Sequence, residues 1–214
     1  PPAGEYIFLR HNYSDTSFYF ISSSSAPGKT IGNAIEPGGQ ANYFSSGSDA
    51  LYIHEKESVN LLKSGREWYE PVSSAGELTI NPEFSGIDTS EPVKFSARML
   101  SRASGQTVFR FYEGGSSIES ITVSGVDINS TTGTFARIEE AVWESVPLSA
   151  SPVFGLRFNN NGDISAGGWL DYLMIRARKK NIFSGTSSFF TDSRSAAPGN
   201  ITAFSIESSI DNVL

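Results

Sequence analysis

Apolar and polar residues alternate with a period of two along much of this 214-residue chain. The alternation is clearest after Pro92, where Val93, Phe95, Ala97 and Met99 are separated by mostly polar or charged side chains. Because successive side chains of a strand point to opposite faces, this pattern predicts a strand with one buried face.

Other short runs of β-branched and aromatic residues lie between clusters of Gly, Ser, Asn and Pro, which favour turns. Ser104-Gly105 and Gly114-Gly115 separate three of these runs, which predicts a meander over residues 92–124. The segment 136–142 is also compatible with a short helix. In order, the predicted strands cover residues 5–10, 17–22, 42–44, 50–55, 92–101, 107–112, 117–124, 134–142, 154–158, 169–179 and 201–206.

Many short strands joined by turns, without a predicted helix of more than two turns, indicate an all-β protein. We therefore predict an antiparallel β-sandwich or jelly roll. We expect residues 1–75 to form an N-terminal β arm or small extra β subdomain that ends in the SGREWY segment, and residues 76–214 to form the sandwich.

Composition and charge narrow the functional classes. Hydrophobic residues make up 38% of the chain and aromatic residues 12%, which is enough for a folded core. The net charge of -7 disfavours binding to a phosphate backbone, so we expect no nucleic-acid partner. The chain has no cysteine, which excludes disulfides, thiolate metal sites and a cysteine nucleophile within these residues.

Candidate catalytic groups are few. Imidazole bases are available only at His11 and His54, which we expect at the surface, and no Gly-x-Ser-x-Gly motif is present. Neighbouring acidic residues could catalyse glycoside hydrolysis only if the fold placed two of their carboxylates on either side of a substrate. The simpler explanation is that these residues are exposed to solvent on the surface or in loops. These acids are Glu55 with Glu57, Glu67 with Glu70, and Glu139 with Glu140. We therefore expect no enzyme activity from this chain itself.

Two oxygen-rich loops, residues 127–130 and 159–163, offer ligands that suit calcium better than zinc. Neither loop has the spacing of a calcium-binding loop, and Asn and Gly are also what tight turns require. We predict structural turns and no cofactor, with calcium as the alternative.

Aromatic side chains offer a second kind of site, because an exposed ring covers the apolar face of a sugar. The candidates are Trp68, Tyr69, Trp143, Trp169 and Tyr172, and the alternative is that they pack in the core. We expect Trp143, beside Glu144 at a strand end, to be exposed and to contact a glycan.

The basic run 176–180 would either bind an acidic partner or lipid headgroups, or protect a strand from aggregation.

The segment 60–71, NLLKSGREWYEP, concentrates charge and large aromatic rings around one glycine. It resembles a signature in the N-terminal region of gingipain-type cysteine peptidases of the PorU type. The matching positions are Asn60, Leu61, Ser64, Gly65, Arg66, Glu67, Trp68 and Tyr69. Two further segments are similar to that group: Gly168-Trp169-Leu170-Asp171-Tyr172-Leu173 with basic residues after it, and the strand 201–206.

This resemblance implies a surface peptidase of the type nine secretion system in Bacteroidetes-like bacteria, with its Cys/His pair in a downstream domain. The present chain would then be a non-catalytic β-sandwich region that precedes the peptidase domain, as part of a longer, exported protein at the cell surface or outer membrane. Its expected partners are the downstream peptidase domain and outer-membrane secretion components. The alternative is a surface carbohydrate-binding or adhesin jelly-roll module.

The residues of the signature also suggest a structural role. Gly65 permits a left-handed turn, and Arg66 and Glu67 would find partners on flanking strands. We expect Trp68 and Tyr69 to fill the seam between the arm and the sandwich, where each ring would bury on the order of 150–250 Å².

Overall fold

The computed structural model describes residues 19–23, 32, 38–63, 65–183 and 188–208. The strand predicted at residues 5–10 lies outside this part of the chain, as do residues 17 and 18 of the one predicted at 17–22. The described residues 19–22 of that second strand are wrong as a strand, because they pair with no other described strand and their side chains are exposed. Within the described residues there is no α-helix, and no helix that is long and apolar enough to cross a bilayer.

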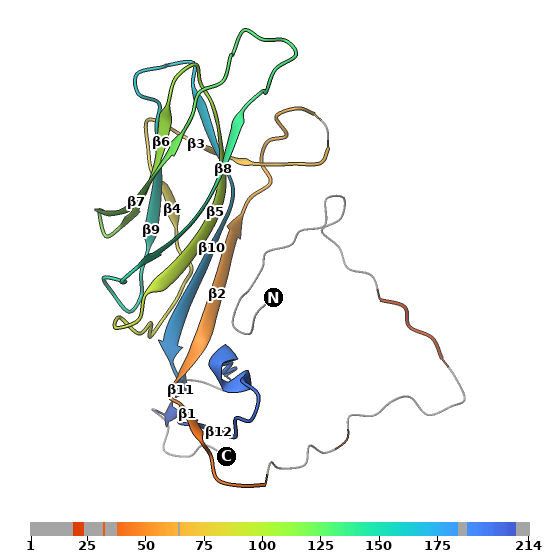
Figure 1. The fold of residues 1–214 in the computed structure, drawn as a ribbon, viewed down its shortest axis with the longest axis vertical. Coiled ribbons are helices and arrows are strands. Elements are labelled where there is room, and N and C mark those ends of the chain that lie inside the picture. Colours follow the sequence, from red (N-terminus) through yellow and green to blue (C-terminus); the bar gives the residue numbers. More distant parts are fainter. Residues whose placement is uncertain (1–18, 24–31, 33–37, 64, 184–187, 209–214) are drawn as a thin grey trace.

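Two antiparallel sheets pack face to face, so the predicted all-β sandwich is confirmed (Figure 1). One sheet has the order β2-β10-β5-β8, with β3 pairing to a second stretch of β10. Its strands are β2 (Gly47–Glu55), β3 (Glu70–Val72), β5 (Val93–Arg102), β8 (Arg137–Ser145) and β10 (Gly167–Lys180). The other sheet has the order β4-β9-β6-β7, from β4 (Leu78–Ile80), β6 (Thr107–Glu113), β7 (Ser116–Val123) and β9 (Phe154–Asn159).

The long strand β10 organises the first sheet. Its residues 172–180 pair with β2, and its residues 168–170 pair with β3. Residues 47–72, which fall in the predicted N-terminal part, therefore contribute two strands to the main sheet. The predicted division between residues 1–75 and 76–214 stays a prediction.

The core lies between the two sheets, where alternate side chains of every long strand meet. Its largest fully buried side chains are Phe95, Phe109, Phe111, Phe154, Ile80, Met99, Leu156, Leu170, Leu173, Ile175, Val93 and Val123. The alternation noted at residues 93–99 is thus the inner face of β5, as its period of two predicts. The helix considered for residues 136–142 is wrong, because this segment pairs with β5 throughout as β8.

At Gly168 the two sheets pack without room for a side chain. A Cβ atom at this position would lie 2.5 Å from Cδ2 of Phe158 on β9, too close for any side chain without movement. Gly168 therefore reflects packing between the layers, whereas a Cβ atom at Gly167 would meet the Trp169 ring of the same strand.

Two small parallel pairs and a short 3-10 helix lie at one end of the sandwich (Figure 1). The pairs are β1 (Tyr43–Ser45) with β12 (Thr202–Phe204), and β11 (Ile182–Phe183) with β13 (Glu207–Ser208), and the helix is η1 (Ser193–Ala196). β12 confirms the strand predicted within residues 201–206.

Candidate functional site

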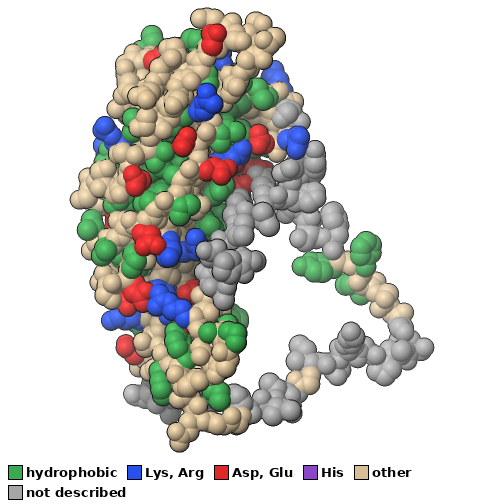
Figure 2. Space-filling model, viewed as in Figure 1, with side chains coloured by type: hydrophobic (Ala, Val, Ile, Leu, Met, Phe, Trp, Pro, Cys, Tyr) green, Lys and Arg blue, Asp and Glu red, His purple; other side chains and the backbone are tan. Residues whose placement is uncertain are grey.

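The outer face of the five-stranded sheet, which points away from the core, carries the residues singled out from the sequence. Its side chains form rows across the strands, because register partners share a face. In order along the sheet, the rows are Asp49–Arg178, Leu51–Arg176–Lys94–Glu144, Ile53–Met174–Ser96–Val142, Glu55–Tyr172–Arg98–Glu140 and Trp169–Leu100–Ile138. Charged rows thus alternate with apolar rows, and Figure 2 shows acidic, basic and hydrophobic side chains close together on one face of the molecule.

The segment 58–69 covers the last of these rows. Tyr69 forms an isolated antiparallel bridge with Val59 and is only 3% exposed. With Leu61 and Leu62 of the same segment, and with Leu100 of the sheet, it lines a small, mostly apolar pocket of about 210 Å³. Burial, followed by a hydrogen bond donated to Glu67 and by the charge of that carboxylate, raises the pKa of the Tyr69 hydroxyl.

Arg98 of β5 joins the two segments that resemble the PorU group. Its guanidinium donates to Asp171 and lies 3.3 Å from Glu67 Oε1, while its Nε lies 3.4 Å from Glu140 Oε1. A β-bulge between Leu170 and Tyr172 accompanies the placement of the Asp171 carboxylate on this outer face. Burial disfavours the charged guanidinium, but the hydrogen bond and charge of Asp171 outweigh it and raise the pKa of Arg98.

Most residues of the signature segment fall in the described part of the chain, although Ser64 lies outside it. Gly65 has a positive φ of 74°, which confirms the left-handed turn. Tyr69 is buried, as expected of a side chain that fills the seam. Trp68 is 37% exposed, so the prediction that its ring is buried as well is wrong. Tyr69, which forms the bridge with Val59, lines the pocket over Leu100, whereas Trp68 does not line it.

The second signature segment is divided between the two faces of β10. Leu170 is fully buried in the core, while Asp171 and Tyr172 belong to the outer face. A functional role for these residues stays a prediction.

Tyr69 and Trp68 give a first test of this arrangement. Tyr69→Ala is expected to lower the free energy of unfolding by about 3 kcal/mol, because it empties a buried site over Leu100. Trp68→Ala is the matched control, with an expected loss of about 1 kcal/mol, since its ring already contacts water. Urea unfolding of both variants measures the difference, and equal losses would contradict it.

At the opposite end of the outer face, a buried ion network ties residues 191–194 to the sheet. Arg178 Nη1 donates to Asp49 Oδ1 at 2.7 Å and to Asp192 Oδ1 at 2.9 Å. Asp192 also accepts from Tyr43 and Ser45, and its side chain is fully buried. Burial would raise the pKa of Asp192, but the hydrogen bonds from Ser45 and Arg178 and the charge of Arg178 hold it below its ordinary value.

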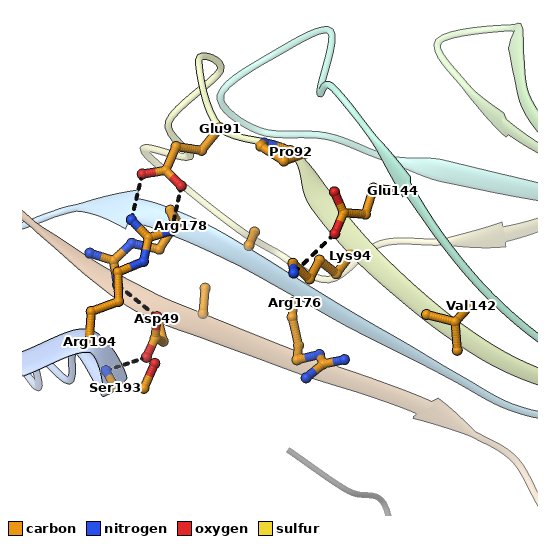
Figure 3. Close-up of a pocket in the computed structure, with 12 residues that line it drawn as sticks. Asp49, Glu91, Pro92, Lys94, Val142, Glu144, Arg176, Arg178, Ser193 and Arg194 are labelled. Atoms are coloured by element: carbon orange, nitrogen blue, oxygen red, sulfur yellow. Dashed lines mark hydrogen bonds and ion pairs between the residues drawn. The ribbon is translucent and has the colours of Figure 1, made fainter. Parts of the chain in front are cut away.

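Between these two ends, the outer face is exposed only in part, since Met174 in the middle of its row is 4% exposed. A pocket of about 500 Å³ is lined there by side chains of β2, β5, β8 and β10 together with residues before β5 and in η1 (Figure 3). Leu51 is 43% exposed, Ile53 37% and Val142 73%. These three apolar side chains on a regular sheet face form the open part of the candidate site.

Trp143 does not lie on this face. Its ring is 8% exposed, stacks on Phe95 at a centroid distance of 5.0 Å and contacts Phe111 at 4.6 Å. The predicted exposure of Trp143 is therefore wrong, because the register of β8 sends it into the core and sends its neighbours Val142 and Glu144 outward. A buried ring in this position cannot stack on a sugar.

His54 is also buried, contrary to its predicted place at the surface. Its Nε2 atom lies 2.5 Å from Glu70 Oε2, and Lys56 Nζ donates to Glu70 Oε1 at 3.0 Å. This pair links β2 to β3 along the same side of β10, which is a structural contact. His11 lies outside the described residues.

The acids of the two oxygen-rich loops take part in local turn contacts. Asp163 Oδ1 accepts from the backbone N–H and hydroxyl of Ser165, and Asp127 Oδ1 accepts from the backbone N–H of Asn129. These contacts support the structural turns. Across the part of the chain that the structure describes, no three His, Cys, Asp or Glu side chains converge on a common point.

Comparison with known proteins finds no family model and no curated protein that matches. Among solved structures, the chain is similar to dimeric latent PorU from Porphyromonas gingivalis, with a TM-score of 0.59 and 18% identity. This match covers 78% of the present chain and 16% of the PorU chain.

Two carbohydrate-binding modules also match in part. One is CBM36 in complex with calcium and xylotriose, with a TM-score of 0.37 and 11% identity over 61% of this chain and 99% of that module. The other is the CBM36-1 domain of a multidomain xylanase from the hindgut metagenome of Trinervitermes trinervoides, with a TM-score of 0.37 and 11% identity over 65% and 99%. Likeness at this level carries no argument about function.

The expected resemblance to the PorU group is thus confirmed at the level of the fold. The chain spans about a sixth of the PorU chain, and it contains no cysteine. It is a non-catalytic β-sandwich domain with respect to cysteine peptidase chemistry.

Sequence reasoning did not single out Arg98, Arg178 or Asp192 as a junction. Each belongs to an ion pair whose partners are 14 to 129 residues apart in the chain. The sequence shows only that a charged residue lies on the polar side of an alternating strand. Because any solvent-exposed sheet face has such residues, this does not identify an ion-pair centre.

Proposed function

We propose that this domain positions a neighbouring folded domain through the outer face of its five-stranded sheet. The observation that carries the proposal is the row Ile53–Met174–Ser96–Val142, in which two exposed apolar side chains lie on a regular sheet face between charged rows. Apolar side chains grouped on a rigid face, with a rim of charges, are typical of an interface between domains.

The fold shared with PorU supports one setting for this role. In that setting, the domain precedes the peptidase domain of an exported cysteine peptidase at the cell surface and docks to outer-membrane secretion components. Val142 lies on β8 at the edge of the sheet, where regular pairing with β5 keeps the face rigid, so an attached domain would be held in one orientation.

The alternative of a carbohydrate-binding or adhesin module loses its main candidate residue, because Trp143 is buried. No described feature of the outer face favours it over contact with a protein domain.

Footprinting with hydroxyl radicals tests the proposal. The isolated chain and the full-length native protein, identified with an antibody against this domain, are labelled in parallel. Labelling of Leu51 and Val142 is expected to fall several-fold in the full-length protein, because the attached domain covers them. Leu148 is the control, because it is 62% exposed and lies against Gly114 of the other sheet.

Two results would contradict the proposal. One is equal labelling of Leu51 and Val142 in both proteins. The other is a native protein no larger than these 214 residues, which leaves no second domain to position.

A further inference from the structure

The pocket on the outer face, beside the ion network of Arg178, is lined by four basic side chains. Lys94, Arg176, Arg178 and Arg194 all line it, although the chain as a whole has a net charge of -7 (Figure 3). Such a concentration of cations calls for bound anions, either within the protein or from a ligand.

Three of these four cations are already paired. Lys94 Nζ lies 3.0 Å from Glu144 Oε1, and Arg178 is held by two aspartates at the end of the face. Arg194 binds both oxygens of Glu91, at 2.9 and 2.5 Å, in the two-pronged geometry that suits a guanidinium and a carboxylate. The side chain of Glu91 thus shows how a carboxylate is bound at the rim of this pocket.

Arg176 is the exception. In the part of the chain that the structure describes, it has no hydrogen bond and no ion pair, and in Figure 3 its guanidinium points away from the paired charges. It lies on the central strand β10, between Leu51 of β2 and Lys94 of β5. Its backbone is therefore fixed by two neighbouring strands, while the five donors of its guanidinium stay available.

The apolar row next to Arg176 defines a second requirement for a ligand. Val142, which is 73% exposed, lines the same pocket two strands away. Arg176 and Val142 are two strands apart and in neighbouring rows, so a ligand that satisfies one and covers the other needs a negative group and an apolar group on the order of 10 Å apart. An extended peptide with an acidic residue a few positions from an aliphatic one has both.

We propose that the pocket around Arg176 binds an acidic peptide segment of a protein partner, with the carboxylate on the Arg176 guanidinium and an aliphatic side chain against Val142. This inference rests on the proposed function, since it names the contact by which the neighbouring domain is held. A single carboxylate matches Arg176, the one basic side chain of the pocket without a partner among the described residues, whereas Glu91, Glu144 and Asp49 around it disfavour a densely anionic surface.

A pair of pentapeptides tests the site on the intact chain. Acetyl-Val-Glu-Val-Glu-Val-amide and its Gln counterpart are titrated by NMR, following the Arg176 side-chain and Val142 methyl signals. The Glu peptide is expected to bind the unmodified chain at least about tenfold more tightly than the Gln peptide, because only it forms charge-assisted hydrogen bonds. This preference is expected to disappear in Arg176→Gln.

Arg110→Gln is the matched control. Arg110 is an exposed strand arginine on the other sheet, also without a described partner, and its replacement is expected to leave the preference unchanged. Both variants are compared by thermal unfolding so that a loss of structure is recognised.

Several outcomes would overturn the inference. They are equal binding of both peptides by the unmodified chain, no binding of the Glu peptide at millimolar concentration, and a preference that survives in Arg176→Gln. Arg176-dependent binding to inorganic phosphate or to phosphatidylglycerol vesicles that exceeds binding to the Glu peptide would assign the pocket to a phosphate or a membrane instead.

The two proposals fail separately. Protection of Val142 in the full-length protein without a Glu preference would leave the positioning role intact and remove the acidic contact. A Glu preference without protection would keep the binding site and remove the positioning role.

Discussion

Trp143→Ala is expected to lower the free energy of unfolding by about 3–5 kcal/mol, one of the two largest effects of a single substitution proposed for this protein. The ring is 8% exposed and is stacked almost parallel on Phe95, with an interplanar angle of 6°, while Phe111 closes its other side. Alanine would leave a cavity that these two rings, fixed on β5 and β6, cannot fill. Urea unfolding monitored by circular dichroism measures the loss.

Two controls make this result specific. Val142→Ala changes the neighbouring residue on the exposed face and is expected to change stability by less than about 0.5 kcal/mol. Trp143→Phe keeps an aromatic ring and removes an indole N–H that has no described partner, so its cost is expected to be about 1.5 kcal/mol or less. A loss below about 1 kcal/mol for Trp143→Ala would contradict the core position of this ring.

Arg178→Met is expected to destabilise the protein by about 3–5 kcal/mol, because it leaves the carboxylate of Asp192 buried without its cation. The Asp192 side chain is fully buried, and the Asp49 side chain is 16% exposed. Loss of this centre would also release residues 191–194 from the sheet. Chemical unfolding at neutral pH measures the effect.

Lys94→Met is the matched control, since it breaks an ion pair on the same face whose partners are 55% and 50% exposed. Its expected effect is within about 1 kcal/mol, because water screens an exposed pair. Similar losses in the two variants would contradict the difference in burial between the two pairs.

The pH dependence offers a second measurement on Arg178→Met. In the native protein the pKa of Asp192 is held below its ordinary value, so this group stabilises the fold above the pKa of about 3.9 that it has when unfolded. That stabilisation is lost as the pH falls through the pKa of the folded state. Without Arg178 the pKa of Asp192 is lowered less, so the variant is expected to lose less stability as the pH falls below the unfolded pKa of about 3.9.

The alternation along the chain was sufficient to predict most of the fold. The strands around residues 93–101, 107–112 and 154–158 lie where the period of two placed them, because one face of each strand has to be apolar to enter the core. For residues 136–142 the sequence left both a strand and a short helix possible, and only the strand is correct. In that segment Glu139, Glu140 and Ala141 favour helix, and pairing with β5 overrides that local preference.

Side-chain burial at strand ends was harder to predict. Trp143 and His54 each have a charged neighbour, Glu144 and Glu55, and the sequence therefore placed both at the surface. In a strand, however, the neighbour of an exposed residue points the other way, so a charged neighbour is an argument for burial.

By itself, the sequence determined the fold class, the absence of cysteine chemistry and the segments 60–69 and 168–173 as unusual features. Tertiary structure alone decided that these two segments meet at Arg98, that Arg178 is paired with two aspartates, and that Arg176, two positions before it, has no partner among the described residues. The physical reason is that alternation assigns a residue to a face, whereas its partners depend on which strands lie side by side. In this fold β10 lies between β2 and β5, which are distant from it in the chain, and their register fixes which charges are neutralised.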